Sequence, residues 1–259
     1  MIGQAPKKSL GQHWLNDPDS LEAMCQAADI TPDDTVLEIG PGLGTLTQLL
    51  VLRAREVIAV EFDESLANSL PTRIQASNLR VETQDILRFD LTKLPKDYKV
   101  VANIPYYLTS NLLRVLSESA NPPAQMALLV QKEVAERVCA HPRAMSLLSV
   151  SVQLYYQASL GEVVPRVLFT PPPKVDSQVL KLTRREQPLF PDLDTKKFFQ
   201  VVKAGFANRR KTLLNSLAGG LHLSKEATAD IITRAGLSPA SRAQELSLED
   251  WYALYREVK

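Results

Sequence analysis

The sequence contains few of the residues on which metal-binding and disulfide-stabilised proteins depend. Its 259 residues include two cysteines and three histidines. Cys25 and Cys139 lie far apart and match no zinc-ligand spacing, and His13, His141 and His222 are equally scattered. We therefore expect reduced thiols, no disulfide framework and no bound metal.

Long apolar runs are also absent from the sequence. The N-terminal residues include Lys7 and Lys8, but no apolar stretch follows these lysines, so the pattern of a secretory signal is missing. No segment approaches the roughly 18 apolar residues of a transmembrane helix. We expect a cytoplasmic protein that does not enter a membrane.

The chain has almost no net charge, but its charges are unevenly spread. The formal net charge is +1, so the chain as a whole is not a polycation. Residues 1–183 hold 17 Lys and Arg against 20 Asp and Glu, whereas residues 184–259 hold 13 against 9. A basic last part indicates that this part meets a polyanion.

Short β-rich runs alternate with amphipathic helical patterns through the first two-thirds of the chain. This order predicts βαβ units and a parallel sheet covered by helices on both faces. Two later β-like runs, 149–163 and 177–184, are close enough in sequence to pair antiparallel at one edge. The strands predicted in the alternating part are 35–40, 56–62, 79–84, 99–104 and 125–131, with helices over 44–53, 63–76 and 109–119.

Only helical patterns follow the proline-containing connector 185–194. We read this change as a boundary between an α/β domain, 1–185, and a small helical domain, 186–259. Gly219-Gly220 and Gly236 are expected to end helices in the second domain. The predicted helices are 195–207, 209–218, 224–235 and 247–258.

A glycine-rich turn, 40–44, joins the first predicted strand to a helix. Glycine at such a junction lets the backbone approach a ligand closely. Glu61 ends the next strand about 20 positions after Gly40, where an acid is placed to accept hydrogen bonds from ribose hydroxyls. The pattern predicts a nucleoside-bearing cofactor, and a purely structural tight turn is the alternative.

The spacing within this turn favours S-adenosylmethionine over a dinucleotide. The dinucleotide fingerprint is G-x-G-x-x-G, whereas this turn reads G-x-G-x-G, with Glu38 just before it. Asp85 and Asn103 follow two further strands and should converge with Gly40 and Glu61 at the carboxyl edge of the sheet. An acid-rich crevice suits the ammonium and sulfonium groups of S-adenosylmethionine, and a nicotinamide-dependent oxidoreductase is the alternative.

The strand 99–104 leads into the sequence Asn103-Ile104-Pro105-Tyr106. Pro105 restricts its own φ and favours extended geometry at Ile104, so the turn is expected to present the Asn103 amide oxygen and the Ile104 carbonyl as two acceptors. The exocyclic amine of a base offers two N–H donors, and stacking of the base on Tyr106 contributes roughly 1–3 kcal/mol. This arrangement predicts methylation of an amino nitrogen by alignment, without a metal. A strand-end turn with buried aromatic rings is the alternative.

Eight blocks spread over nearly the whole chain resemble the small-subunit ribosomal RNA adenine N6-dimethyltransferase family. The turn at 103–106 alone marks amino-group methyltransferases in general, whereas FTPPPKVDS (169–177) and NRRKTLLNSL (208–217) point to this family. The blocks are KSLGQHWLND (8–17), VLEIGPGLGTLT (36–47), VEFDESL (60–66), QDIL (84–87), NIPYYLTSNLL (103–113), LLVQKEVAERV (128–138), FTPPPKVDSQVLKL (169–182) and FANRRKTLLNSL (206–217).

The resemblance implies a fold, a reaction and a partner. The fold is a Rossmann-like class I S-adenosylmethionine-dependent methyltransferase sheet (α/β class) with a small C-terminal all-helical domain that binds RNA. The reaction is transfer of methyl groups to N6 of two adjacent adenines in the 3′-terminal hairpin loop of small-subunit rRNA, late in ribosome biogenesis. The implied partner is a pre-ribosomal small subunit, and we expect the enzyme to be a monomer.

The resemblance also implies the roles of individual residues. The target adenine would lie against Asn103, Ile104 and Tyr106, with Phe169 stacking on its other face. Asn is common in the family where His13 stands here. A backbone contact with the cofactor would survive this difference, whereas a contact that needs the side-chain amide would not. The cofactor-binding residues carried over are His13, Leu15, Gly40, Glu61, Asp85 and Asn103.

No acidic residue occurs between Thr195 and Lys225, a stretch that carries seven lysines and arginines. Arg209-Arg210-Lys211 are expected to open a helix there. In a chain expected to bind RNA, these cations predict phosphate contacts, and a solvated face is the alternative. The predicted RNA-binding residues are Lys174, Lys203, Arg209, Arg210 and Lys211.

Two further hypotheses remain open at this point. A methyltransferase of the antibiotic-resistance type would share the fold and the 103–106 turn but modify an adenine of large-subunit rRNA. A non-catalytic assembly factor would use the same fold only to bind the ribosome.

Overall fold

The computed structural model describes residues 6–7, 10–208 and 210–258. Contacts between Cα atoms divide the chain into two compact units. The first unit takes in the chain up to Glu136 together with Tyr156–Arg184, and the second takes in Arg137–Tyr155 and the chain from Arg185 onward.

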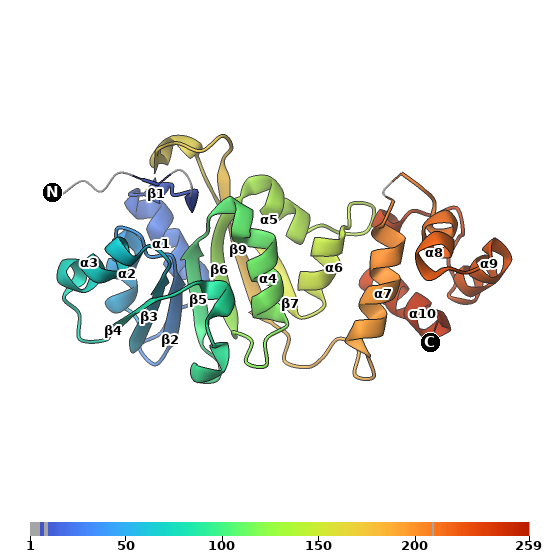
Figure 1. The fold of residues 1–259 in the computed structure, drawn as a ribbon, viewed down its shortest axis with the longest axis horizontal. Coiled ribbons are helices and arrows are strands. Elements are labelled where there is room, and N and C mark those ends of the chain that lie inside the picture. The colour runs from blue at the N-terminus through green and yellow to red at the C-terminus, as the bar shows by residue number, and fades with distance from the viewer. Residues whose placement is uncertain (1–5, 8–9, 209, 259) are drawn as a thin grey trace. The chain divides into compact units, whose positions relative to one another are not determined.

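A seven-stranded sheet forms the centre of the first unit, in the order β4-β3-β2-β5-β6-β9-β7 (Figure 1). The first five strands of this order are mutually parallel, and β9 pairs antiparallel with both β6 and β7. The predicted parallel strands and the predicted antiparallel pair are therefore confirmed. The bounds are β2 (Thr35–Ile39), β3 (Glu56–Glu61), β4 (Leu79–Thr83), β5 (Lys99–Asn103), β6 (Gln125–Gln131), β7 (Tyr156–Val164) and β9 (Ser177–Arg184).

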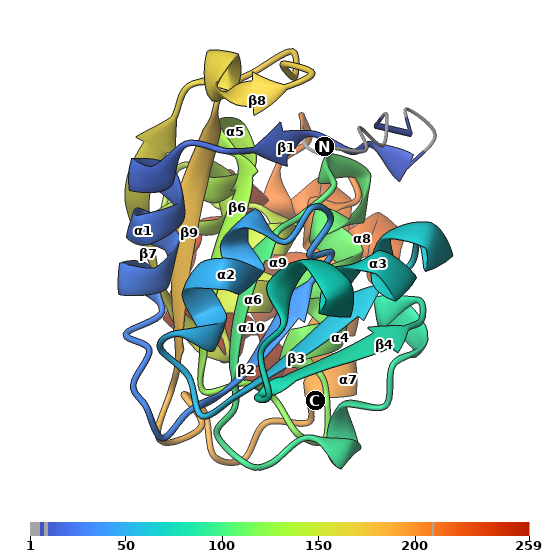
Figure 2. The same ribbon diagram turned by 90° about the vertical axis from the view of Figure 1, so that its left-hand side faces the viewer.

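Helices cover both faces of this sheet. In the view of Figure 2, α1 (Pro18–Ala27), α2 (Thr45–Val51) and α3 (Glu64–Ile74) lie in front of the strands, and α4 (Thr109–Ser117) lies behind them. Every residue of β2 is buried, as expected for a strand with helices on both sides. Single turns of 3₁₀-helix follow the strands at η2 (Ile86–Arg88), η3 (Leu91–Lys93), η4 (Tyr106–Leu108) and η5 (Arg166–Leu168), and α5 (Lys132–Val138) follows β6.

A separate two-stranded ribbon brings the N-terminal segment to the loop that precedes β9. In it, β1 (Trp14–Leu15) pairs antiparallel with β8 (Phe169–Thr170). This pairing joins two of the family-like blocks, 8–17 and 169–182, which lie far apart in the sequence. The sequence pattern did not predict it.

The predicted strand 149–163 is only partly right, because its first residues are helical. Leu147–Gln153 form α6, and β7 begins at Tyr156. Ser146 and Ser149 cap the helix reciprocally: the Ser146 hydroxyl accepts the Ser149 N–H at 3.1 Å, and the Ser149 hydroxyl accepts the Ser146 N–H at 2.9 Å. The alternating Val-Ser-Val sequence imitates the period of a strand, although the helix buries both valines.

The second unit packs α6 with four further helices around an apolar core. Its helices after residue 185 are α7 (Thr195–Phe206), α8 (Leu213–Leu221), α9 (Lys225–Arg234) and α10 (Leu248–Val258), with a 3₁₀ turn at η6 (Ala243–Glu245). A single boundary at 185/186 omits Arg137–Tyr155 from this unit, although that segment contributes side chains to its core. The core includes Met145, Val150 and Leu154 beside Phe198, Val202, Leu213, Leu217, Trp251 and Leu254.

The helix end predicted at Gly219-Gly220 in the second unit is wrong. Gly219 and Gly220 lie inside α8, which ends at Leu221. A Cβ at Gly220 would lie 2.5 Å from the Cβ of Ala204 on α7, so this glycine serves close helix packing rather than termination. Gly236 does follow the end of α9, with φ +77°.

The predicted start of α8 at Arg209 is also wrong. The helix begins at Leu213 after Thr212, which has extended backbone dihedrals, and Arg210 and Lys211 precede it in a turn. Arg209 lies outside the described residues. In the described part of the chain, no helix combines the length and apolar character needed to cross a bilayer.

Candidate active site

A cavity of about 250 Å³ lies at the carboxyl ends of the parallel strands of the first unit. All six residues predicted to bind the cofactor line it, and so do the predicted target-site residues Ile104 and Tyr106. Five segments contribute most of its wall: 10–15, 38–43, 60–62, 84–87 and 103–108. The topology therefore gathers in one place residues that are spread over almost 100 positions of sequence.

The glycine turn between β2 and α2 needs glycine at three positions. Gly40, Gly42 and Gly44 have φ values of +67°, +57° and +84°, in the left-handed region that strains other residues. Nothing lies within 4 Å of the place where a Cβ of Gly40 would be, so this residue keeps its backbone open to the cavity. Gly44 instead packs against α3, where a Cβ would lie 2.7 Å from the Leu70 side chain.

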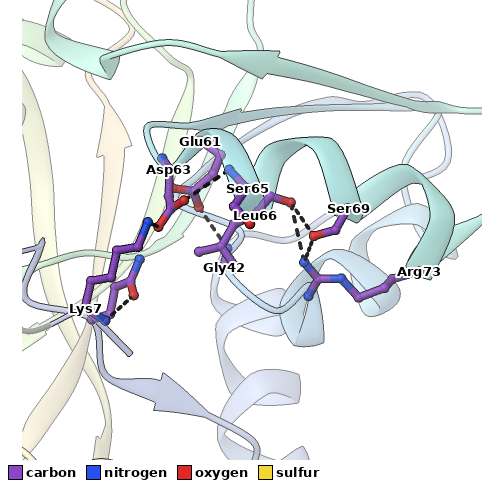
Figure 3. Close-up of polar contacts among 9 residues, drawn as sticks. Lys7, Gly42, Glu61, Asp63, Ser65, Leu66, Ser69 and Arg73 are labelled. Atoms are coloured by element: carbon purple, nitrogen blue, oxygen red, sulfur yellow. Dashed lines mark hydrogen bonds and ion pairs between the residues drawn. The ribbon is translucent and has the colours of Figure 1, made fainter. Parts of the chain in front are cut away.

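Glu61, at the end of β3, is a buried acid held by two backbone N–H groups. Its Oε2 accepts the Gly42 N–H at 3.1 Å and its Oε1 accepts the Asp63 N–H at 2.8 Å (Figure 3). Burial raises the pKa of this carboxyl, although the two hydrogen bonds oppose the shift. The contact with Gly42 joins the acid directly to the glycine turn.

Glu38 is a second buried acid in the cavity, and it was not among the residues predicted to bind the cofactor. It is 1% exposed, and its Oε2 has no hydrogen-bond partner among the described residues. Burial raises the pKa of Glu38 to about 8, and the neighbouring Glu61 carboxylate adds to the effect. A buried carboxyl that has one unpartnered oxygen and lies next to a second acid fits a ligand that brings positive charge or N–H donors.

Asp85 follows β4 and lines the same cavity. Its Oδ1 accepts the Leu87 N–H at 3.0 Å and so caps the 3₁₀ turn η2. This bond uses one carboxylate oxygen and fixes the side chain at the cavity wall.

The amide of Asn103 is oriented by the N-terminal segment. Its Nδ2 donates to the backbone carbonyl of His13 at 3.1 Å. A carbonyl can only accept, so this contact assigns the nitrogen to that side and leaves Oδ1 as the acceptor on the other. At Ile104 the side chain is 2% exposed and the N–H donates to the Leu129 carbonyl at 3.2 Å.

Tyr106 is a half-buried ring held at its hydroxyl and on one face. Its hydroxyl lies 2.9 Å from Ser177 Oγ, and its ring stacks on His13 with centroids 5.9 Å apart and planes inclined by 22°. His13 Nδ1 lies in turn 2.7 Å from the Pro171 carbonyl. These contacts connect the 103–106 turn to the N-terminal segment and to the 169–177 block.

Phe169 does not line the cavity. It is 3% exposed on β8, where its backbone pairs with that of Leu15, and it packs in an apolar cluster that includes Leu129 and Val179. The structure therefore brings together all the predicted catalytic residues except Phe169.

The predicted RNA-binding residues that the structure describes are all exposed. Lys174 lies in the loop of the first unit that precedes β9, and its carbonyl accepts from Arg166 Nη1 at 3.2 Å. In the second unit, Lys203 lies on α7, and Arg210 and Lys211 lie in the turn before α8. Within the described ranges, no cluster of three or more His, Cys, Asp or Glu side chains is placed to hold a metal ion.

Comparison with protein families gives one match that spans almost the full chain. Residues 3–259 match the model of the family described as ribosomal RNA adenine dimethylase. The chain is also 44% identical over 252 residues to the ribosomal RNA small subunit methyltransferase A of Dehalococcoides mccartyi, covering 96% of this chain and 87% of the relative. The protein of the same name from Streptococcus equi subsp. zooepidemicus is 41% identical over 266 residues, covering 98% of this chain and 92% of the relative.

Two solved structures with the same fold are methyltransferases with different names. A dimethyladenosine transferase from Plasmodium falciparum superposes with a TM-score of 0.80 at 28% identity, covering 93% of this chain and 96% of that one. The 23S rRNA methyltransferase ErmE superposes with a TM-score of 0.77, also at 28% identity, covering 94% and 98%. Backbone similarity alone thus does not identify the RNA that this chain modifies.

Proposed function

The chain belongs to the ribosomal RNA adenine dimethylase family, and from this premise we propose that it dimethylates N6 of two adjacent adenines in the 3′-terminal hairpin loop of small-subunit rRNA. It is an S-adenosylmethionine-dependent methyltransferase. Its substrate is a pre-ribosomal small subunit in the cytoplasm, and it acts as a monomer late in subunit biogenesis.

The cavity suits S-adenosylmethionine by charge and by shape. When bound, S-adenosylmethionine supplies an activated methyl group on its sulfonium. Glu61 and Asp85 line the cavity and would accept hydrogen bonds from the ribose hydroxyls and the adenine amine. His13 and Leu15 line it from the N-terminal segment. The orphaned Glu38 oxygen and the open space over Gly40 support the assignment, because they offer a cationic ligand a partner and room.

The reaction requires an adenine amine whose lone pair is free to attack. That lone pair is normally delocalised into the ring, which makes N6 a poor nucleophile. Asn103 Oδ1 and the Ile104 carbonyl each accept one N–H of the amine, which favours a pyramidal nitrogen with its lone pair directed away from both acceptors. With S-adenosylmethionine bound, the amine held by these two acceptors would take its methyl group, S-adenosylhomocysteine would be the leaving group, and the alkylated nitrogen would lose its proton to solvent. Orientation supplies much of the rate.

Aromatic side chains hold the base flat during transfer. Tyr106 is the stacking surface within the cavity, braced by Ser177 at its hydroxyl. Phe169 would stack on the opposite face. Its ring is buried in this structure, so stacking requires the segment around it to move. Turning the target base out of its hairpin loop is the usual route to such a pocket.

Cations outside the cavity position the RNA through its phosphates. Lys203, Arg209, Arg210 and Lys211 contribute from the helical part, and Lys174 contributes beside β9. Phosphate contacts carry little sequence information, so these residues give affinity while the loop shape and the cavity give the choice of adenine.

The orientation of Asn103 is the observation that carries this proposal. A backbone carbonyl takes its only donor group and thereby leaves the oxygen as the acceptor that N6 needs. The test is to incubate the enzyme with immature small subunits and labelled S-adenosylmethionine and to locate the label by mass spectrometry. We expect dimethyladenosine at two adjacent positions of the 3′ hairpin and none with Asn103→Ala.

The large-subunit alternative is tested in the same experiment. The ErmE structure shares the fold, but the more similar proteins, at 40–44% identity, are named for the small subunit. Naked large-subunit RNA is supplied in a parallel reaction. Label that enters only the large-subunit RNA would overturn the proposed substrate while leaving the chemistry intact.

A further inference from the structure

The N-terminal segment forms one wall of the cavity and is fixed firmly at its far end. Residues 10–15 line the cavity. Trp14 and Leu15 form β1, and the Leu15 carbonyl also accepts the Thr45 hydroxyl at 2.9 Å. The His13 carbonyl accepts the Asn103 amide. This end of the wall is therefore held by the sheet edge, by α2 and by the substrate-binding turn.

The near end of the wall is held through an ion pair. Lys7 Nζ lies 2.7 Å from Asp63 Oδ2 (Figure 3). Two backbone contacts connect Lys7 to the wall itself: its N–H donates to Gln12 Oε1 at 2.8 Å, and its carbonyl accepts the Leu10 N–H at 3.0 Å. Through these two contacts, a change in the position of Lys7 also affects Leu10 and Gln12, which line the cavity.

Asp63 belongs to the opposite, cofactor-binding side. Its side chain is 4% exposed, whereas that of Lys7 is 54% exposed. Its N–H donates to Glu61 Oε1 at 2.8 Å, and its own Oδ1 accepts the Ser65 N–H at 3.1 Å, which caps α3. Lys7 holds the pKa of Asp63 below its usual value, so the buried partner keeps its charge. The ion pair therefore bridges the wall and the turn that carries Glu61.

We propose that Lys7 and Asp63 are positioning residues that clasp the N-terminal wall over bound S-adenosylmethionine and so set how fast the cofactor exchanges. The proposal rests on the proposed function, which requires S-adenosylhomocysteine to leave and S-adenosylmethionine to enter at each transfer. Because the Lys7 side chain is 54% exposed, water can replace it at Asp63, and the ion pair opens at low cost. Neither residue needs to touch the transferred methyl group.

Lys7→Ala is the variant that opens the clasp. We expect S-adenosylmethionine to dissociate about three- to tenfold faster, because the pair combines one exposed and one buried charge. The KM for the cofactor should rise by a similar factor, whereas kcat should change less than twofold and the KM for RNA should stay the same. Lys7→Arg, which keeps the charge, should restore the dissociation rate to within about twofold.

Matched controls separate the clasp from a general effect of charge or folding. Lys96→Ala removes the same charge from an exposed position that does not line the cavity, and it should leave the dissociation rate unchanged. Added salt should speed dissociation from the natural protein but not from Lys7→Ala. Melting temperatures of all variants identify any that fail to fold. Because Lys7 and Lys96 are exposed, we expect their variants to fold normally.

The outcomes distinguish the clasp from the function on which it rests. A natural protein that binds and uses S-adenosylmethionine, with an unchanged dissociation rate in Lys7→Ala, would overturn the clasp alone. Equal losses of kcat and melting temperature at an unchanged dissociation rate would also overturn it, since they would indicate a structural role. A natural protein that binds no S-adenosylmethionine would overturn the proposed function and the clasp together.

Discussion

Glycines open a cavity in the first unit, whereas in the second unit they close an interface between helices. Gly40 and Gly42 have positive φ and keep side chains out of the space above the sheet. Gly205 and Gly220 lie within helices, where a Cβ would lie 2.4 Å from Trp251 and 2.5 Å from Ala204. Glycine thus leaves space for a ligand in the first unit, whereas in the second unit it lets neighbouring side chains and helices approach closely.

The two units also differ in where their buried polar atoms without hydrogen-bond partners lie. Among the described residues, the first unit leaves a carboxylate oxygen of Glu38 buried in the cavity without a partner. The unpartnered buried atoms of the second unit, Ser216 Oγ and Trp251 Nε1, belong instead to helices packed around an apolar core. Unpaired buried acceptors cost free energy unless a ligand satisfies them. This difference predicts that mutations in the first unit affect catalysis first, and mutations in the second affect stability or RNA affinity.

The largest expected effect is the loss of methyl transfer when Asn103 in the first unit is replaced. Asn103→Ala removes the acceptor for the target amine and the bond to the His13 carbonyl, and we expect methyl transfer to fall about 10²–10³-fold, as when one oriented group is removed from an active site. The melting temperature should change little. Single-turnover rates measure the effect, and Asn111→Ala, at an exposed position on α4, is the matched control. Full activity in Asn103→Ala would remove the basis of the proposed mechanism.

The next effect concerns packing in the second unit. Gly220→Ala forces a methyl group into the α7–α8 contact and should lower the free energy of unfolding by about 1–3 kcal/mol, while cofactor affinity stays the same. Denaturant titration measures the change. Its neighbour Gly219 has nothing within 4 Å of the place where a methyl group would lie, so Gly219→Ala should be neutral or stabilising by up to about 1 kcal/mol. Equal effects at both positions would contradict the packing explanation.

Glu38 provides a pH test of the first unit. Its pKa is raised to about 8 in the folded protein, against an ordinary value near 4.5, so folding takes up a proton between these limits. Stability of the ligand-free protein should therefore fall as pH rises from about 5 to about 8, by up to ~1.4 kcal/mol per pH unit. Glu38→Gln should flatten this dependence in thermal melts. A slope unchanged by Glu38→Gln would show that Glu38 is ionised throughout.

The smallest expected effect is on RNA affinity. Replacing Arg210 and Lys211 together by alanine should weaken RNA binding about three- to tenfold and reduce the slope of log K against log salt by about 1–2, without changing cofactor affinity. Binding measured over a series of salt concentrations gives both values. Lys93 and Lys96, exposed in the first unit, supply the matched double substitution. An unchanged slope of log K against log salt would mean that Arg210 and Lys211 are exposed to solvent and do not contact RNA phosphates.

Most of the sheet and the convergence of its strand ends followed from the sequence, because both depend on local patterns. The parallel strands are apolar runs separated by helical patterns, and Gly40, Glu61, Asp85 and Asn103 each follow or end one of them. A short polar-apolar alternation misled the prediction at 149–153, since Val150 and Val152 have the period of a strand while the Ser146 cap selects a helix.

The parts that escaped prediction depend on contacts between distant segments. The Asn103 amide is oriented by a carbonyl 90 positions earlier, and Tyr106 is braced by a hydroxyl 71 positions later. The ion pair between Lys7 and Asp63 and the helix contact at Gly220 are of the same kind. Residue type and spacing identify candidates for such contacts but do not specify the partner.

A crystal structure of the protein with S-adenosylmethionine bound would show whether the cavity aligns the methyl group with the target amine. We expect the methyl group to point into the cavity toward Asn103 Oδ1 and the Tyr106 ring, at a distance that leaves room for N6 of an adenine about 3–3.5 Å from the methyl carbon. A methyl group that points away from both residues, or a cofactor bound outside this cavity, would contradict the proposed alignment.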